Sequence, residues 1–332
     1  MTGAFRAPGR VNLIGDHTDY NEGFVLPIAI DRECVVRFRP RSDDRVRVDG
    51  ADAAGLAAAV VHVLGERGRP PAGIDAEVSS SVPIGAGLSS SAAFEVALAL
   101  ALCDAAGFEL PAEELAVACQ QAEHVATGVP CGIMDQLTSV AGRDGCALLI
   151  DCRSLEITPV PLPPDVGVLV VHSGVARALA DTAYAERRAA CEAVAARLGL
   201  RSLRDARPEQ VADEPRARHV VSENARVLAA ADALRDGAVD RLGPLLMESH
   251  ASLRDDYEVS TPELDALVAA LDDAGALGAR LTGAGFGGCV VALAPSSELE
   301  RIADAASGPY RSETGLAPTA FACRAVGGAG PV

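Results

Sequence analysis

The stretch from Gly9 to Gly23, GRVNLIGDHTDYNEG, places charged and hydrogen-bonding side chains around one glycine turn. Arg10, Asp16, His17 and Asp19 all lie in it, close to the apolar run VNLI. Carboxylates accept hydrogen bonds and imidazole can donate or accept them, so this set suits a ligand with many polar groups. The density of these side chains predicts a binding site for a small polar molecule.

A second stretch, SSVPIGAGLSSSAAFE from Ser80 to Glu95, predicts a glycine-rich loop that leads into a helix. The backbone N–H groups of such a loop and the positive end of the helix dipole form a cradle for phosphate. The residues of this cradle are Gly85, Ala86, Gly87, Leu88, Ser89, Ser90 and Ser91. The loop lacks the Gly-Lys-Ser/Thr of a Walker motif, so Mg²⁺ and an arginine must neutralise the phosphates, and the Ser90 and Ser91 hydroxyls can serve the metal. The alternative is that the three serines only cap the helix.

Two acids follow this loop in the sequence. Glu123 falls on a predicted helix, and Asp135 comes after a turn that contains Gly128, Pro130 and Gly132. Such a turn lets the chain fold back, so that both carboxylates can face one cavity. The alternative is that each acid is an ordinary solvated side chain, as most aspartates and glutamates are.

The third glycine-rich stretch, LTGAGFGGC from Leu281 to Cys289, contains the spacing G-x-G-x-x-G. A dinucleotide-binding loop of this spacing opens a helix and is followed by an acidic residue about twenty positions later. Here the glycines lead instead into CVVALA, an apolar run that is typical of a strand. We therefore interpret the stretch as a loop that approaches a ligand or another backbone, and not as an NAD site.

The composition limits the partners of the protein. Its 332 residues include 46 acidic and 29 basic side chains, and the net charge of −17 repels nucleic acid and anionic membranes. No segment reaches the roughly 18 to 20 apolar residues of a membrane span. The nine cysteines are scattered without a C-x-x-C pair. We expect a soluble, cytoplasmic, monomeric protein with reduced thiols, whose partners are small molecules.

The order of the predicted strands and helices indicates an α+β protein. The runs FVLPIAI, ECVVRFRP and DRVRVDG predict an antiparallel sheet, and segments 89–107 and 111–128 predict two packed helices. Prolines concentrated from 159 to 164 interrupt any central strand, so we expect a domain boundary near Pro161. Beyond it we expect a buried strand VGVLVVHSG, helices at about 180–198, 219–235, 238–253, 262–274 and 296–311, a closing strand TAFACRAV and a frayed tail GGAGPV.

Together the three glycine-rich stretches resemble those of the GHMP small-molecule kinases, and the first looks like that of the galactokinases in particular. The phrases CGIMDQ, YAERR and YEVSTPELD also stand at family-like separations between Arg6 and about Ala294. The resemblance covers most of the chain. It implies a two-lobed α+β GHMP kinase fold, with ATP and sugar in the cleft between an N-terminal lobe (residues 1–160) and a C-terminal lobe (residues 161–332).

The resemblance also implies roles for individual residues. Arg10 and Asp135 match the family's catalytic pair, the arginine beside the transferred phosphoryl group and the aspartate as the proposed base. The residues that match the family's sugar contacts are Asp16, His17, Asp19, Gly132, Asp135 and Tyr184. Ser91 and Glu123 match its Mg²⁺ ligands, and the loop from Gly85 to Ser91 matches its ATP phosphate cradle.

The implied activity is ATP-dependent phosphorylation of the anomeric hydroxyl of D-galactose. Asp16 stands where most of the family carries glutamate, so L-arabinose and N-acetylgalactosamine stay open as alternative substrates, and a non-catalytic sugar and ATP sensor is a third alternative. Ala176, followed by Arg177, stands where the family usually has arginine, which leaves one cation near the phosphoryl group missing or displaced. The family's W-x-N-Y helix has no counterpart in this chain, which contains no tryptophan, so the adenine contacts are not predicted.

Overall fold

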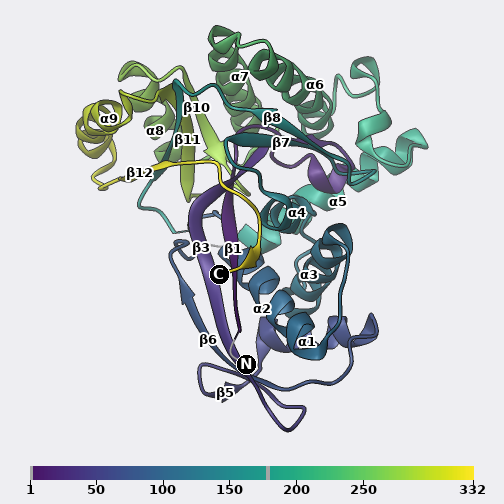
Figure 1. The fold of residues 1–332 in the computed structure, drawn as a ribbon. Coiled ribbons are helices and arrows are strands. Elements are labelled where there is room, and N and C mark those ends of the chain that lie inside the picture. Colours follow the sequence, from purple (N-terminus) through teal and green to yellow (C-terminus); the bar gives the residue numbers. More distant parts are fainter. Residues whose placement is uncertain (1–2, 177–179) are drawn as a thin grey trace.

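A computed structural model describes residues 3–176 and 180–332 as two lobes, each built on its own sheet (Figure 1). The first lobe, in the lower half of Figure 1, has a six-stranded sheet with helices packed against one face. In spatial order its strands are β13 (Gly330–Pro331), β1 (Gly3–Asn12), β3 (Pro27–Pro40), β6 (Ile74–Ser80), β4 (Val46–Val48) and β5 (Ala51–Asp52). Its helices are α1 (Gly55–Glu66), α2 (Ser90–Ala106), α3 (Ala112–Thr127) and α4 (Met134–Ala141).

The pairing of β1 with β3 sets the position of the first polar stretch. The two strands run antiparallel, and their register shifts between Pro8 and Arg10. Such a bulge bends a strand and re-aims the side chain that follows it. The predicted antiparallel sheet is confirmed for these strands, although most of FVLPIAI and all of ECVVRFRP form one long strand, β3, instead of two. β4 departs from the pattern because it pairs with β6 in parallel.

The helices of the first lobe follow their sequence patterns. α2 is rich in alanine and leucine, and ten of its seventeen residues are buried between the sheet and its neighbours. The helix is followed by Gly107, whose φ of 59° is a conformation that glycine adopts without steric cost. α3 begins after Pro111 and carries Glu113 and Glu114 in its first turn, where acids interact favourably with the helix dipole.

The second lobe has a four-stranded antiparallel sheet with helices around it (Figure 1). In spatial order the strands are β10 (Gly278–Thr282), β11 (Cys289–Pro295), β9 (Val166–His172) and β12 (Thr319–Cys323). The longer helices are α5 (Ala180–Leu198), α6 (Pro215–Arg235), α7 (Leu242–Asp255), α8 (Pro262–Asp273) and α9 (Leu299–Thr314), with short 3-10 helices η1 (Asp19–Asn21), η2 (Leu203–Asp205), η3 (Pro208–Gln210) and η4 (Val239–Arg241). The helices predicted after residue 180 are confirmed, with shifts of a few residues at their ends.

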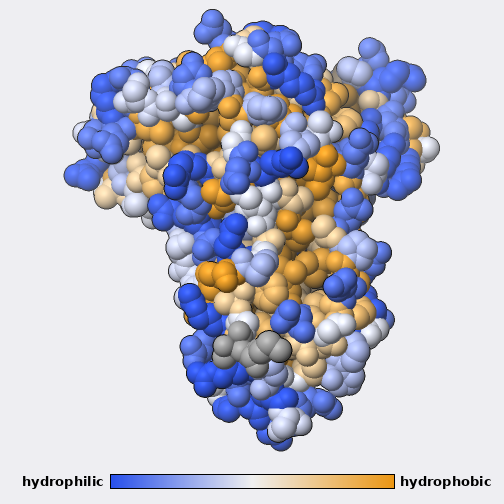
Figure 2. Space-filling view, in the orientation of Figure 1, coloured by the Kyte–Doolittle hydropathy of each residue, from blue (hydrophilic) through white to orange (hydrophobic). Residues whose placement is uncertain are grey.

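A small third sheet and one continuous hydrophobic cluster join the lobes. The sheet has the order β2 (Phe24–Val25), β7 (Cys146–Asp151) and β8 (Ile157–Pro161), and its proline-rich strand lies at an edge, where a missing N–H is tolerated. The cluster includes Val11 of β1 and Ile28 of β3 together with Val170 of β9 and Val291 of β11, all fully buried. Burial of each such side chain contributes about 1.5 to 3 kcal/mol, so the lobes are packed on each other. Figure 2 shows hydrophilic residues over the outer ends of both lobes.

The prediction of a frayed C-terminal tail was wrong. β13 pairs antiparallel with β1, opposite Phe5 and Arg6, and so returns the end of the chain to the first lobe. Glycine and proline are rare in strands, but proline is accepted in an edge strand such as β13. The division of the chain into residues 1–160 and 161–332 stays a prediction.

Candidate active site

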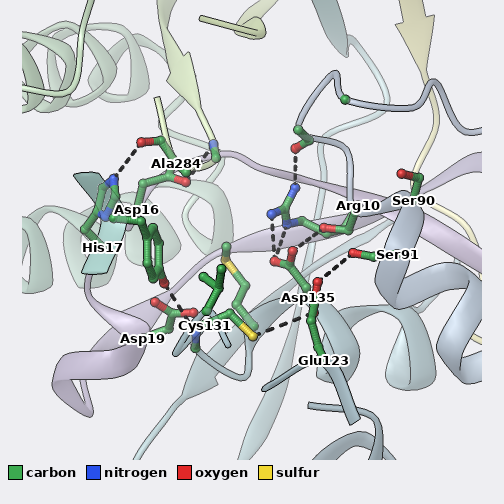
Figure 3. A pocket seen from close by; sticks show the side chains of 18 residues that line it. Arg10, Asp16, His17, Asp19, Ser90, Ser91, Glu123, Cys131, Asp135 and Ala284 are labelled. Atoms are coloured by element: carbon green, nitrogen blue, oxygen red, sulfur yellow. Dashed lines mark hydrogen bonds and ion pairs between the residues drawn. The ribbon is translucent and has the colours of Figure 1, made fainter. Parts of the chain in front are cut away.

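A cavity of about 390 Å³ lies between the loops of the first lobe and the β10–β11 loop of the second (Figure 3). A volume of this order suits a small-molecule ligand. From the sequence predictions, the lining contains Arg10, Asp16, His17, Asp19, Gly85, Gly87, Ser89, Ser90, Ser91, Glu123, Gly132, Asp135 and Tyr184. Only Ala86 and Leu88 of the predicted site residues are not in this lining, and their side chains are buried in the core shared by the lobes.

Arg10 and Asp135 form an ion pair at the centre of the cavity (Figure 3). Arg10 Nε lies 2.8 Å from Asp135 Oδ1, and Nη2 lies 2.6 Å from the same oxygen. Arg10 Nη1 donates to the Gly87 carbonyl at 2.6 Å, so the guanidinium is held from two sides. Arg10 is 4% exposed, and Asp135 is the second residue of α4, in the first turn, which faces the cavity. The pairing that the sequence predicted is therefore present.

The glycine-rich loop from Gly85 to Ser89 ends at the N-terminus of α2, which is open to the cavity. Gly85 and Gly87 have φ values of 74° and 81°, and Ser89 at the N-cap of α2 has a φ of 61°. Within the described residues, the Ser89 side chain makes no capping bond to the first turn of α2. The simple helix-cap alternative is therefore wrong for Ser89, and the first N–H groups of α2 stay available for an anion.

Ser91 and Glu123 meet at the end of the cavity next to this loop. The Ser91 hydroxyl donates to Glu123 Oε1 at 2.8 Å, and Gln136 Nε2 donates to Glu123 Oε2 at 2.7 Å. Burial raises the pKa of the Glu123 carboxyl, with the nearby charge of Asp135 as a second cause. The solvated-surface alternative for Glu123 is therefore wrong. Among the described residues there is no cluster of three or more His, Cys, Asp or Glu side chains suited to a metal ion.

Asp19, Gly132 and Tyr184 lie together at the other end of the cavity. A Cβ atom added to Gly132 would lie 1.7 Å from Asp19 Oδ2, so only glycine allows this close approach. The Gly132 N–H donates to the Tyr184 hydroxyl oxygen at 3.3 Å. Burial raises the pKa of Asp19 to about 6, and the neighbouring charge of Asp135 adds to the effect. This end of the cavity thus combines a carboxylate and a phenol, both able to bond hydroxyl groups.

His17 lies at the same end, but its ring is used within the protein. Nε2 lies 3.2 Å from the Ala284 carbonyl oxygen, which can only accept, so this nitrogen carries the proton. Nδ1 therefore accepts from the Tyr20 hydroxyl, 2.8 Å away. Burial holds the pKa of His17 well below its usual value, so the ring stays neutral. The imidazole joins the first polar stretch to the β10–β11 loop, while its predicted contact with a ligand stays untested.

Asp16 is held by groups from both lobes. Its Oδ1 accepts from the Gly283 N–H at 2.8 Å, and its Oδ2 accepts from Asn12 Nδ2 at 3.0 Å. The guanidinium of Arg280, fully buried in β10, lies 2.6 Å from Oδ2. Arg280 also donates to the Leu13 carbonyl at 3.1 Å. Asp16 thus has a fixed orientation where it borders the cavity.

The described contacts of the third glycine stretch confirm that it approaches another backbone. Gly283 donates to Asp16, and a Cβ atom on Gly285 would lie 2.3 Å from the Val259 carbonyl oxygen.

The chain is similar to proteins of known family. Three family models match the chain: the galactokinase galactose-binding signature at residues 2–40, the GHMP kinases N terminal domain at 54–143 and the GHMP kinases C terminal at 230–312. A galactokinase of Roseiflexus sp. (strain RS-1) is 48% identical over 98% of this chain and 92% of its own length.

The chain belongs to the galactokinase family of the GHMP kinases. The crystal structure of Lactococcus lactis galactokinase complexed with galactose matches with a TM-score of 0.94 and 31% identity, over 100% of this chain and 95% of that one. A homoserine kinase from Cytophaga hutchinsonii, 18% identical with a TM-score of 0.70 over 100% and 97% of the two chains, shares the fold. These matches confirm the α+β GHMP kinase fold that the sequence predicted.

Sequence reasoning missed several residues of this galactokinase-family site. Val129, Cys131, Met134 and Ala284 also line the cavity, and Arg280 supports it from behind Asp16. Apolar residues in a glycine-rich turn carry no signal of their own, although Cys131 and Met134 lie in the family-like phrase CGIMDQ. After Ser-Gly-Val, where the family usually has arginine, Ala176 is exposed, and Arg177 lies outside the described residues.

No helix in residues 3–176 and 180–332 has the length and apolar character that a membrane crossing requires.

Proposed function

We propose that the protein transfers the γ-phosphoryl group of ATP to the anomeric hydroxyl of D-galactose. The observation that carries the proposal is the position of the Arg10–Asp135 pair in one cavity, between the open N-terminus of α2 and the polar end formed by Asp19 and Tyr184. Figure 3 shows Ser90 and Ser91 at one side of this pair and Asp16 and His17 at the other. The galactokinase relatives, one of them in complex with galactose, support galactose as the substrate.

The reaction forms one bond and breaks one. The anomeric oxygen attacks the γ-phosphorus, the bond between that phosphorus and the bridging oxygen of ADP breaks, and the hydroxyl proton goes to solvent water. The guanidinium of Arg10 donates hydrogen bonds to the negatively charged oxygens of the phosphoryl group, and Asp135 accepts a hydrogen bond from the attacking hydroxyl. A loose phosphoryl-transfer transition state asks little of a base, so Asp135 acts mainly by orienting the hydroxyl.

The donor set of Ser91 and Glu123 fits Mg²⁺. A hydroxyl oxygen and a carboxylate oxygen in contact, beside an anion-binding loop, are the hard ligands that this ion takes together with phosphate oxygens and water. When bound, Mg²⁺ neutralises charge on the phosphates of ATP. Gln136, which donates to Glu123, would keep the other carboxylate oxygen in place.

A coupled assay of ADP release over a panel of sugars tests the proposal. We expect turnover with D-galactose and ATP, and lower kcat/KM with L-arabinose, N-acetylgalactosamine and D-glucose. A higher kcat/KM for one of the other sugars would show that this sugar, and not D-galactose, is the preferred substrate. If calorimetry shows binding of galactose and ATP but the assay shows no ADP release, the protein is a sensor. The Arg10–Asp135 ion pair favours the enzyme over the sensor.

A further inference from the structure

Ser89 has a backbone conformation that is rare for a residue with a side chain. Its φ and ψ are 61° and 47°, in the left-handed region that glycine occupies without penalty. A serine at a helix N-cap normally has an extended backbone and accepts a bond from the first turn. Ser89 does neither within the described residues, so its side chain has a different use.

The Ser89 hydroxyl donates to Asp135 Oδ2 at a distance of 2.5 Å. Arg10 occupies the other oxygen of the same carboxylate, Oδ1. Arg10 in turn is bonded to the phosphate loop through the Gly87 carbonyl, at 2.6 Å, and its backbone N–H donates to the Leu88 carbonyl at 3.0 Å. One short loop segment therefore holds both members of the ion pair.

We propose that Ser89 is a positioning residue for Asp135. With Arg10 on Oδ1 alone, the carboxylate can turn about its bond to Cβ, and the hydroxyl on Oδ2 removes this freedom. The left-handed backbone of Ser89 is the conformation that directs the hydroxyl toward Asp135 and away from the helix. The inference rests on the proposed function, in which Asp135 orients the attacking hydroxyl, and it assigns Ser89 a use other than a phosphate contact.

Two other uses of Ser89 make different predictions. If the hydroxyl bound a phosphate of ATP, its loss would weaken ATP binding. If it only stabilised the loop, its loss would lower the melting temperature and change kcat only through the fraction of folded protein. A positioning role predicts a lower kcat, an unchanged affinity for ATP, and no link between kcat and thermal stability.

The test compares Ser89→Gly with Ser89→Ala, which both lack the hydroxyl but differ in their tolerance of a positive φ. We expect kcat to fall roughly ten- to a hundredfold in both variants, since a small misplacement of a reacting group has effects of this size. The dissociation constant of ATP, measured by calorimetry, should stay within about twofold of wild type. The melting temperature should be higher for Ser89→Gly than for Ser89→Ala, because glycine relieves the strained backbone.

Asp49→Gly is the matched control. Asp49 also has a positive φ, 50°, but lies in the turn between β4 and β5 and lines no part of the cavity. We expect Asp49→Gly to change the melting temperature without changing kcat. Wild-type kcat in Ser89→Gly, or ATP binding weakened in proportion to the loss of rate, would overturn the role of Ser89 alone. A wild-type protein that releases no ADP with any sugar would overturn the proposed function and the role of Ser89 together.

Discussion

Arg10 Nη2 lies 2.6 Å from Asp135 Oδ1, an ion pair that joins β1 to the first turn of α4. Because Asp135 orients the attacking hydroxyl in the proposed function, we expect Asp135→Asn to reduce kcat by about a hundredfold or more. Asp135→Ala should abolish turnover, with ATP affinity within a few fold in both variants, since the proposed role of the carboxylate involves the sugar hydroxyl and not the binding of ATP. The control is Asp104→Asn at an exposed site near the end of α2. Wild-type kcat in Asp135→Asn would refute the catalytic assignment.

The Ser91–Glu123 contact makes a prediction about the metal. Removing one carboxylate oxygen from a Mg²⁺ site weakens the site and acts on nucleotide binding and chemistry together. Glu123→Gln should raise the Mg²⁺ concentration for half-maximal rate by about tenfold or more. Glu114→Gln, an exposed glutamate on the same helix, should leave the titration unchanged. An identical magnesium titration for Glu123→Gln and wild type would remove Glu123 from the metal site.

The approach of Gly132 to Asp19 makes a prediction about the sugar. A methyl group at position 132 would lie 1.7 Å from Asp19 Oδ2, so Gly132→Ala must displace the carboxylate. We expect the KM for galactose to rise about tenfold or more while ATP affinity stays within a few fold. Gly65→Ala on α1, where an added Cβ meets no atom within 4 Å, should leave KM unchanged and stabilise the helix by about 0.5 to 1 kcal/mol. A wild-type KM in Gly132→Ala would show that Asp19 does not contact the sugar.

The raised pKa of Asp19 predicts a pH dependence. Burial moves this pKa from 3.8 to about 6, so the carboxylate form, the better acceptor for a sugar hydroxyl, is lost as the pH falls through about 6. We expect kcat/KM for galactose to fall by about tenfold per pH unit below that point, and Asp19→Asn to lose this limb while its overall activity is lower.

The same shift predicts an effect on stability with a definite sign. Because the pKa of Asp19 is higher in the folded protein, its contribution to the free energy of unfolding is complete below about pH 3.8 and is lost as the pH rises through about 6. Asp19→Asn should therefore gain melting temperature relative to wild type at alkaline pH, and show no gain in acid. Two results would contradict the raised pKa of Asp19: a wild-type kcat/KM that does not change with pH around 6, or a gain in melting temperature of Asp19→Asn that is equal in acid and at alkaline pH.

Most helices could be predicted because their signals are local. The predicted helix at about 262–274 corresponds to α8, where Thr261 is the N-cap, accepting from the Leu264 N–H at 3.3 Å, and Pro262 occupies the first helical position. The strand β11 is a run of apolar residues, buried except at its last position, and its pattern is visible without the fold. β13 was missed because its two residues become a strand only by pairing with β1.

The site could be predicted where the motifs are dense, and not where a residue depends on a distant partner. Arg280 lies in a short apolar strand, and its partner Asp16 comes from the other lobe, so nothing near it in the sequence explains a buried charge. Ser89 was predicted as a phosphate contact because its neighbours form a cradle. Its left-handed backbone and its bond to Asp135 depend on how α4 packs against the loop, which local patterns do not encode.

The contacts of Asp16 sharpen the choice between galactose and L-arabinose, which is galactose without its terminal CH₂OH. Asp16 accepts bonds from Gly283, Asn12 and Arg280. A carboxylate has about four acceptor sites, so one is left for a hydroxyl of the ligand. If that hydroxyl is the terminal one of galactose, L-arabinose leaves this acceptor site unpaired and is disfavoured.

We therefore expect wild type to prefer galactose over L-arabinose by about tenfold or more in kcat/KM, and Asp16→Ala to bring the two sugars close to parity. Asp16→Glu should lower kcat/KM for galactose, because the longer side chain moves the carboxylate away from Arg280, which is fully buried and needs this partner. The three proteins are compared on both sugars in the ADP-release assay, with melting temperatures to detect unfolded variants. A wild-type preference for L-arabinose that Asp16→Glu reverses would show that the shorter acid has changed the substrate.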